Sequence, residues 1–183
     1  DWMRKRGMLD NTIVVFLSDH GTHIGDRGML QKQTFYNEVV RVPYIVWYPP
    51  AVAGGRRIRT PVEIRSMLPT VMELAGLEVP EHCRNASLAR TLREGAEPEP
   101  RPVFCEFTLG TFGVRPDDKL VMVLDGAWKM TAWAGDDGVL RDVTVHDLAA
   151  DPHETRNLAG RPEAAEAERR LGALILGHLR EHG

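Results

Sequence analysis

The sequence predicts an α/β fold that continues into a small α+β subdomain. Residues 12–18 and 44–48 are almost continuously apolar and rich in β-branched and aromatic side chains, which is typical of strands buried on both faces of a sheet. Residues 66–75 carry apolar side chains at helical spacing. Beyond residue 102, short apolar runs alternate with Gly, Pro and Asp, as in antiparallel hairpins. We therefore expect residues 1–100 to belong to an α/β domain and residues 101–183 to form the subdomain.

The N-terminal segment and the stretch between the two apolar runs have simple local signals. Residues 1–6 are typical of the end of a surface helix, which Gly7 stops. After the first run, a polar loop with regularly placed glycines is expected up to Gly28. Residues 34–41 are predicted to form a short helix that ends before Pro43, because the residue preceding a proline disfavours helical backbone.

The segment after the second apolar run is predicted to be helical in two places. Ser66 is expected to cap the helix of residues 66–75, and Gly76 is expected to end it. A surface connection rich in Pro, Glu and Arg follows, and it includes a short helical stretch at residues 87–93.

The subdomain is predicted to be a sheet of hairpins closed by a helix. Its four strands are expected at residues 103–108, 119–124, 128–133 and 143–148. The clearest turn lies at residues 135–138, and residues 163–179 have the apolar face of an amphipathic helix. The acidic pairs Asp117–Asp118 and Asp136–Asp137 are predicted to be solvated turns.

The charge balance excludes two classes of partner. The 183 residues include 23 Lys and Arg against 26 Asp and Glu, which gives a formal net charge of −3. Binding to nucleic acid or to an anionic membrane surface requires a basic excess, so we expect neither partner. The longest apolar run, residues 13–17, is also far shorter than the roughly 20 residues that span a bilayer.

The cysteines and the first residue bear on the compartment. Cys83 and Cys105 cannot form a disulfide framework and lack the spacing of a zinc or redox motif, so we expect a reducing, cytoplasmic environment. The sequence starts at Asp1 with neither an initiator Met nor a leader. We therefore expect a processed or truncated chain, and export to the periplasm stays open.

Chemistry is predicted where the first apolar run ends. Ligands of open α/β sheets bind outside the carboxyl ends of strands, and Asp19 and His20 follow such a strand directly. A carboxylate beside an imidazole is a plausible half of a divalent-metal site, and Gly21 lets the backbone turn away from it. Lys32, across the glycine-containing loop, could neutralise an oxyanion. The alternative for Asp19, His20 and Gly21 alone is a turn with an Asx hydrogen bond.

A longer ordered pattern favours the functional alternative. It runs through Ser18-Asp19-His20-Gly21, Gly25-Asp26-Arg27-Gly28, Lys32, Phe35-Tyr36-Asn37-Glu38 and Arg41-Val42-Pro43. Farther along stand Leu68-Pro69-Thr70, Asp125-Gly126-Ala127-Trp128-Lys129 and His146-Asp147-Leu148, the last followed by Asp151-Pro152-His153-Glu154 and Asn157-Leu158. This order resembles the C-terminal signature of the sulfatase family, within the alkaline phosphatase superfamily. The resemblance implies that residues 1–100 are the end of an alkaline-phosphatase-like mixed sheet sandwiched by helices.

The resemblance also implies roles for individual residues. Asp19 and His20 would be ligands of one divalent metal ion, and Lys32 would bind the sulfate or phosphate oxygens. Imidazole in place of the Asn found in many sulfatases suits manganese or zinc, but Asp-His-Gly members also use calcium, so calcium or manganese is expected ahead of zinc. The family nucleophile is a formylglycine made from Cys or Ser in Cys/Ser-x-Pro-x-Arg. Neither Cys83 nor Cys105 has that context, so the nucleophile is expected in a missing N-terminal part.

Two loop residues depart from the family pattern. Arg27 stands where members often have His, and its guanidinium could bind an anionic substrate group through paired hydrogen bonds. The alternative for Arg27 is a solvated loop cation. His23 stands where Glu, Met or Asp is common and could also contact the substrate's organic group, but it is predicted to be a surface histidine. His146, His153, His178 and His182 have no ligand spacing, so no chemistry is expected of these four residues.

The resemblance leads to three hypotheses about function. The first is the C-terminal part of a metal-dependent sulfuric ester hydrolase that acts on a small-molecule sulfate ester and is inactive without its N-terminal part. The second is a phosphonate monoester hydrolase or phosphodiesterase of the same superfamily. The third is a non-catalytic truncated module. A truncated chain is expected to expose apolar sheet surface, whereas a self-contained module is not.

Overall fold

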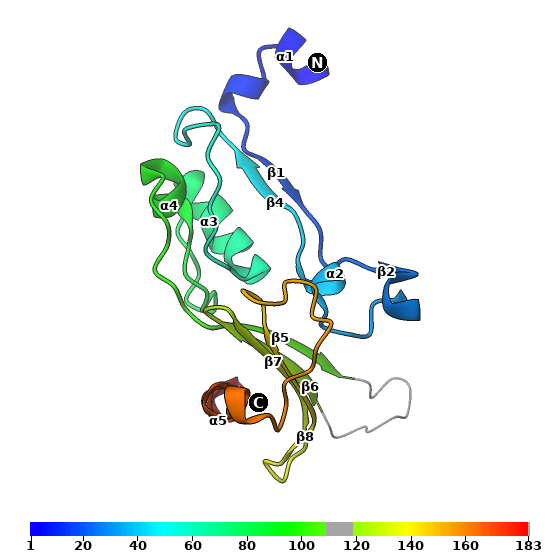
Figure 1. The fold of residues 1–183 in the computed structure, drawn as a ribbon. Helices are drawn as coiled ribbons and strands as arrows, with labels where there is room; N and C mark the ends of the chain where they lie inside the picture. Colours follow the sequence, from blue (N-terminus) through cyan, green and yellow to red (C-terminus); the bar gives the residue numbers. More distant parts are fainter. Residues whose placement is uncertain (109–118, 183) are drawn as a thin grey trace. The chain divides into compact units, whose positions relative to one another are not determined.

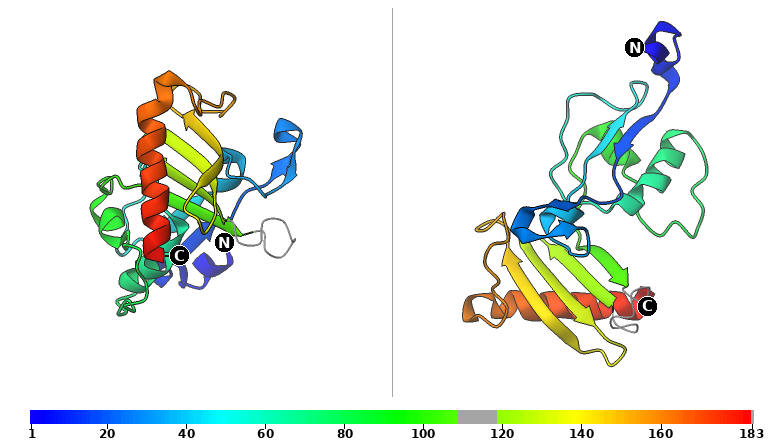
Figure 2. Two further views of the ribbon diagram at one scale, coloured as in Figure 1. Left: turned by 90° about the horizontal axis from the view of Figure 1, so that it is seen from below. Right: turned by 90° about the vertical axis from the view of Figure 1, so that its right-hand side faces the viewer.

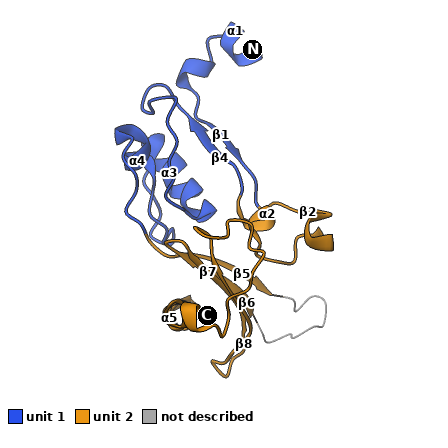
Figure 3. Cartoon of the chain, viewed as in Figure 1, with its two compact units in different colours: residues 1–19, 42–100 blue, residues 20–41, 101–183 orange. Residues whose placement is uncertain are grey.

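A computed structural model of the chain describes residues 1–108 and 119–182. The residues form two compact units, of which unit 1 contains residues 1–19 and 42–100 and unit 2 contains residues 20–41 and 101–183 (Figure 3). The units therefore assign residues 20–41 to the C-terminal part, whereas the predicted domains assigned them to the N-terminal part. The domain division itself stays a prediction. The described helices include none with the length and apolar character needed to cross a membrane.

Unit 1 contains a two-stranded antiparallel sheet and short helices (Figure 1). Strand β1 (Val14–Leu17) pairs with β4 (Tyr44–Trp47), with Phe16 opposite Ile45. The helical elements are α1 (Trp2–Lys5), η1 (Leu9–Asn11), η3 (Ile64–Ser66), α3 (Met67–Leu74) and α4 (Ala89–Glu94). All the elements predicted for this region are confirmed to within a few residues.

The prediction that both strands are buried on both faces is wrong for this chain. Phe16 is 61% exposed and Ile45 is 57% exposed, and Val14 and Trp47 occupy the same face of the pair. Side chains alternate along a strand, so one face of the pair is apolar, and on it Val14, Phe16 and Ile45 are exposed while Trp47 is half-buried. The reason is that the sequence pattern reports the polarity of a strand, whereas burial depends on a second layer that would pack against it. This is the exposed sheet surface that the truncation hypothesis predicts.

Helix α3 begins differently from the prediction and ends as predicted. Ser66 was expected to cap the helix, but its hydroxyl donates instead to the carbonyl oxygen of Glu63 at 2.7 Å. The 3-10 turn of residues 64–66 leads directly into α3, so Ser66 already has helical dihedral angles and cannot act as a side-chain cap. Gly76 follows the helix with a φ of +72°, the left-handed conformation that ends many helices.

Unit 2 is built on a four-stranded antiparallel sheet covered on one face by a helix (Figure 2). The strands are β5 (Val103–Thr108), β6 (Lys119–Asp125), β7 (Trp128–Ala134) and β8 (Leu140–Asp147), in that spatial order. Helix α5 (Ala165–His182) follows the 3-10 turn η5 (Pro162–Ala164). The predicted strands and C-terminal helix are confirmed.

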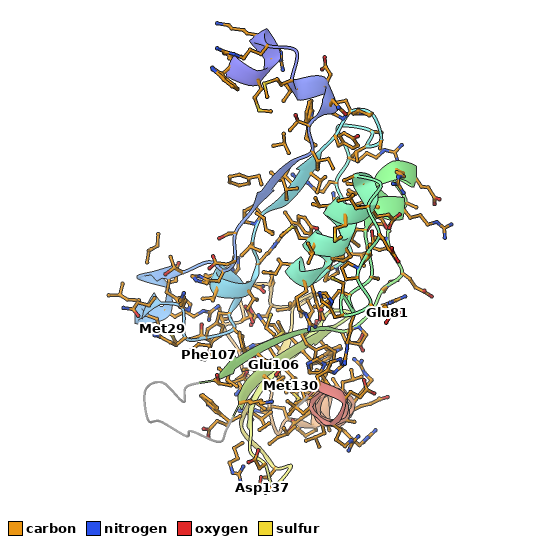
Figure 4. The ribbon with its side chains drawn as sticks, turned by 180° about the vertical axis from the view of Figure 1, so that it is seen from behind. Met29, Glu81, Glu106, Phe107, Met130 and Asp137 are labelled. Atoms are coloured by element: carbon orange, nitrogen blue, oxygen red, sulfur yellow. The ribbon has the colours of Figure 1, made fainter. Side chains whose placement is uncertain are left out.

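The core of unit 2 lies between the sheet and α5. Its buried side chains include Val121, Val123, Met130, Ala132, Val145, Leu171 and Ile175. Figure 4 labels Met130 on the α5 side of the sheet and Asp137 at the tip of the β7–β8 hairpin. Asp137 accepts a hydrogen bond from the backbone N–H of Val139, and Asp136 is beside it in the turn, as predicted. Asp117 and Asp118 lie outside the described residues.

Residues 20–41 belong to unit 2 and carry elements that the sequence did not predict. Strands β2 (His23–Ile24) and β3 (Leu30–Gln31) form a small hairpin around the 3-10 turn η2 (Asp26–Gly28). Strands of two residues are too short to produce an alternating pattern, which explains why this region was predicted to be a loop. The short helix α2 (Asn37–Val40) follows and is confirmed.

Candidate functional site

His20 is held in one tautomer by its neighbours. Its Nδ1 lies 2.7 Å from the carbonyl oxygen of Gly21, which can only accept a hydrogen bond, so Nδ1 carries the proton. The other ring nitrogen, Nε2, accepts from the ammonium group of Lys32 at 2.5 Å. A metal-binding histidine usually has the same tautomer, with Nδ1–H held by a backbone carbonyl, but here the Nε2 lone pair is occupied by the Lys32 ammonium group.

Lys32 and His20 are brought together by the chain path between them. Lys32 directly follows β3, while His20 lies three residues before β2, so the hairpin returns the lysine to the histidine. Lys32 is exposed and His20 is half-buried. The pair therefore presents a cation and an imidazole nitrogen at an accessible position.

Gly21 is required for a reason other than the one predicted. Glycine was expected here because it lets the backbone turn away, but the φ of Gly21 lies outside the left-handed region, so the turn does not depend on the conformational freedom of glycine. Instead, a Cβ atom at this position would lie 2.0 Å from the carbonyl oxygen of Glu38 in α2. The Gly21 N–H donates to the carbonyl oxygen of Val39 at 2.7 Å, so the backbone after His20 packs directly on the backbone of α2.

Asp19 is the last residue of unit 1 and is exposed. Its carboxylate lies 3.5 Å from the hydroxyl of Ser18. Within residues 1–108 and 119–182, no group of three or more His, Cys, Asp or Glu side chains has an arrangement that could hold a metal ion. Metal binding by Asp19 and His20 therefore remains a prediction, with the tautomer of His20 as the feature that fits it.

Arg27 is engaged with the protein main chain. Its guanidinium donates to the carbonyl oxygens of Glu154, at 3.0 Å, and His153. The same group lies 3.9 Å from the centre of the Tyr36 ring and 3.5 Å from the carboxylate of Glu38. Arg27 is thus no fully solvated loop cation, and its predicted contact with substrate stays untested.

His23 is buried, so the prediction of a surface histidine is wrong. Its Nε2 lies 2.7 Å from the hydroxyl of Thr34, and its ring meets the ring of Tyr36 edge to face. His23 packs against these two residues, which follow β3 in the chain, and the contacts account for its burial. A two-residue strand leaves no sequence signal that could have revealed it.

A buried ion pair beside α2 was not predicted from the sequence. Lys129 Nζ lies 2.7 Å from Glu154 Oε1, and the two side chains are only 2% and 1% exposed. Lys129 also donates to Asn37 Oδ1 at 3.2 Å, and the Asn37 N–H donates to Glu154 Oε2 at 2.8 Å. Burial lowers the pKa of Lys129, while the nearby carboxylate of Glu154 opposes that shift. Both residues stand in the motifs quoted for the family resemblance, which was the available signal.

His146 lies directly opposite Lys129 in the β7–β8 pairing and is 4% exposed. Among the described residues, neither of its ring nitrogens has a hydrogen-bond partner. Burial lowers the pKa of His146; the Glu154 carboxylate opposes this shift and the Lys129 ammonium adds to it. Alternation along the strands places both side chains on the sheet face opposite α5, since their neighbours Met130 and Val145 face the α5 core.

Comparisons with known proteins agree on one family. The sulfatase family model matches residues 1–77. N-acetylglucosamine-6-O-sulfatase of Bacteroides thetaiotaomicron is 28% identical over 186 residues, which cover 96% of this chain and 31% of that protein. The multifunctional alkaline phosphatase superfamily protein PehA of Trinickia caryophylli is 30% identical over 180 residues, covering 90% of this chain and 33% of that protein.

The fold comparison gives the same result. A solved structure of a protein in complex with its substrate D-glucosamine-2-N,6-O-disulfate superposes with a TM-score of 0.83 at 26% identity. The match covers 98% of this chain and 36% of that one, and the α/β class with a C-terminal antiparallel sheet and helix is thereby confirmed. The chain spans about a third of the length of the proteins it matches. The chain therefore belongs to the sulfatase family, within the alkaline phosphatase superfamily, and corresponds to the C-terminal portion of its members.

Proposed function

We propose that the chain is the C-terminal part of a metal-dependent sulfuric ester hydrolase. The observation that carries this proposal is the His20–Lys32 contact, in which an imidazole Nε2 lone pair and an ammonium group share one accessible position. Family membership supports the reaction class. The nucleophile, a formylglycine, is assigned to a part of the enzyme outside these residues, and the chain alone is expected to be inactive.

In this proposal Asp19 and His20 bind one divalent cation, calcium or manganese ahead of zinc. The Nδ1–H tautomer of His20 supports its part in the ligand set, because a ligating nitrogen must be unprotonated. In this structure the Nε2 lone pair accepts from Lys32, so binding of the cation requires the Lys32 ammonium group to release it. When bound, the cation supplies Lewis-acid polarisation of a sulfate oxygen. Carboxylate oxygen and imidazole nitrogen together suit manganese, and calcium is retained because Asp-His-Gly members of the family use it.

Lys32 is assigned to the sulfate oxygens. An ammonium group has three donors, and in this structure one of them is bonded to His20 Nε2. Once Lys32 has released the Nε2 lone pair to the cation, its donors can bind the anionic oxygens of the ester and stabilise the negative charge that develops on them in the transition state. Lys32 is therefore proposed both to bind substrate and to take part in catalysis.

Arg27 is proposed as a secondary substrate contact. Both of its Nη atoms already donate to main-chain carbonyl oxygens, so an anionic substrate group would have to share these donors. One relative is an N-acetylglucosamine-6-O-sulfatase, and one similar structure holds D-glucosamine-2-N,6-O-disulfate. A small-molecule sulfate ester, with an amino-sugar sulfate as the first candidate, is accordingly the proposed substrate class.

A phosphonate monoester hydrolase or phosphodiesterase is the second candidate. It is favoured by the 30% identity to a multifunctional superfamily member. Assays of the enzyme that contains these residues, on aryl sulfate and aryl phosphonate esters with calcium or manganese, separate the two candidates. A sulfate-to-phosphonate ratio of kcat/KM below one would overturn the sulfatase assignment.

Substitution of the lysine tests the site. Lys32→Ala is expected to lower kcat by about 10²- to 10³-fold, the cost typical of removing one oxyanion donor. Lys5→Ala changes another exposed lysine, in α1, and serves as the matched control, with unchanged kcat expected. Equal activity of the two variants would remove Lys32 from the mechanism.

A further inference from the structure

The buried charges of unit 2 converge on one residue at the start of α2. Glu154 accepts the Asn37 N–H at 2.8 Å, Lys129 donates to the Asn37 side chain at 3.2 Å, and the two charged groups are 2.7 Å apart. We call these three residues the Asn37 anchor. A buried ion pair gains little net stability, because removing both charges from water is costly. The contribution of the Lys129–Glu154 pair is therefore more a matter of the backbone position that it fixes than of net stability.

A second set of contacts holds the same segment beside the anchor. Arg27, in η2, donates to the main-chain carbonyl of Glu154, which lies 127 residues away in the sequence. Arg27 and Glu154 have φ values of 58° and 52°. Residues with side chains disfavour that region, and they persist there only where surrounding contacts determine the conformation.

The Asn37 anchor is linked to the candidate site by a short path. Asn37 is the first residue of α2, and Val39 in the same helix accepts the Gly21 N–H at 2.7 Å. Gly21 is bonded to His20, and its carbonyl oxygen holds His20 Nδ1 at 2.7 Å. A Cβ on Gly21 would lie only 2.0 Å from the Glu38 carbonyl oxygen, so the backbones of Gly21 and α2 are already as close as a glycine allows. A displacement of α2 is therefore transmitted to His20.

We propose that Lys129 and Glu154 are positioning residues for the reaction, acting through Asn37 and α2 on His20 and Lys32. They touch neither substrate nor metal. Their role is to fix the backbone that sets the tautomer and direction of the His20 ring. The inference rests on the proposed function for its catalytic consequence, but the anchoring itself depends only on contacts within unit 2.

Hydrogen exchange on the 183-residue chain tests the anchoring without any activity. Glu154→Gln removes the negative charge of the Asn37 anchor, and Glu163→Gln makes the same change in an exposed ion pair with Arg156. We expect amides of residues 20–41 to exchange about tenfold faster or more in Glu154→Gln, through loss of a charged hydrogen bond. The β6 and β7 amides should keep their protection, and Glu163→Gln should match the unsubstituted chain. Unchanged exchange of residues 20–41 in Glu154→Gln would overturn the proposal.

If Glu154→Gln fails to fold, the double variant Lys129→Met with Glu154→Gln takes its place. Removing both charges avoids leaving one of them buried and unpaired, so the sheet is expected to survive. The faster exchange of residues 20–41 is expected in this variant as well. Exchange equal to that of the unsubstituted chain, in a folded double variant, also overturns the proposal.

The catalytic consequence is measured in the enzyme that contains these residues. Glu154→Gln is expected to lower kcat and the affinity for calcium or manganese by about 10- to 100-fold, as substitutions behind metal ligands do, with a smaller effect on KM. Glu163→Gln should leave all three values unchanged. Normal kcat and metal affinity in a Glu154→Gln enzyme with a loosened segment would refute the positioning role. An unsubstituted enzyme inactive on sulfate and phosphonate esters would refute the proposed function alone, since the exchange experiment still decides the anchoring.

Discussion

Adding one methyl group to Gly21 should separate the backbone after His20 from α2. The new Cβ would lie 2.0 Å from the Glu38 carbonyl oxygen, whereas ordinary contact begins near 3.4 Å. The difference, 3.4 minus 2.0, requires a displacement of about 1.4 Å by a helix backbone rather than by a flexible side chain. The Gly21–Val39 hydrogen bond, at 2.7 Å, cannot survive a shift of that size.

The expected cost of Gly21→Ala is about 1–3 kcal/mol, as for other overpacked sites. Amides of residues 20–41 should therefore open roughly 5- to 150-fold more often, which hydrogen exchange measures directly. In the enzyme that contains these residues, kcat/KM should fall by about 100-fold, because a displacement near 1 Å at a reacting group has that effect.

Gly177→Ala is the matched control in the same unit. Gly177 lies in α5, and the closest atom to its added Cβ is the flexible end of Arg180, 4.0 Å away. The same chemical change is expected to stabilise the helix by about 1 kcal/mol, through the helix preference of alanine. If Gly21→Ala exchanged like the unsubstituted chain while Gly177→Ala behaved as expected, the steric argument for Gly21 would be wrong.

Further predictions concern the buried charges and the exposed strands. Lys129→Met should lower the free energy of unfolding by about 3–5 kcal/mol, because it leaves the Glu154 carboxylate buried without its partner charge. Adding Glu154→Gln should recover part of that loss, as a double-mutant cycle measured by urea unfolding would show. Strictly additive effects of the two substitutions would contradict the coupling. The pKa of His146 is lowered in the folded chain, so as the pH falls the unfolded chain takes up a proton at a higher pH than the folded chain does. The free energy of unfolding should therefore decrease below about pH 6.5, by at most roughly 1.4 kcal/mol per pH unit. His146→Phe should flatten this dependence in urea titrations at several pH values, and an unchanged slope would exclude His146 as its source. Phe16→Ser, on the exposed strand face, should change stability by less than about 0.5 kcal/mol and reduce self-association in sedimentation experiments; a larger loss of stability would mean that this face is covered.

The order of elements followed from local patterns in the sequence. The β6, β7 and β8 strands were predictable because Gly, Asp and Pro mark the turns between apolar runs of sufficient length. Helix α5 was predictable from its single apolar face. The β2–β3 hairpin was not, since two-residue strands leave no period to detect.

Burial was harder to predict than secondary structure, because it depends on distant parts of the chain. Phe16 and Ile45 have the polarity of core residues and are exposed, whereas His23 and His146 are polar and buried. The residues of the candidate site likewise differ in how far the sequence could predict them. Asp19, His20 and Lys32 were predicted from a contiguous pattern, and their roles stay predictions, although the fold places His20 and Lys32 in contact.

Lys129 and Glu154 illustrate what the sequence pattern lacked. Charged residues are mostly exposed, so their types alone predicted nothing about a buried pair. Only the strand register, which places Lys129 on the face away from α5, and the left-handed backbone of Glu154 bring them together. Both are consequences of the tertiary fold.

The path of the chain between the two units has a consequence for folding kinetics. The chain enters unit 2 at residue 20, leaves it after residue 41 and returns at residue 101. The bond between Asn37 and Glu154 therefore closes a loop of 117 residues, at an entropic cost of about 4 kcal/mol from chain length alone. Contacts of such long range form late, after the local hairpins of β5 to β8. We expect the sheet to be complete before residues 20–41 dock on it, so that the His20–Lys32 contact becomes ordered in the last step of folding.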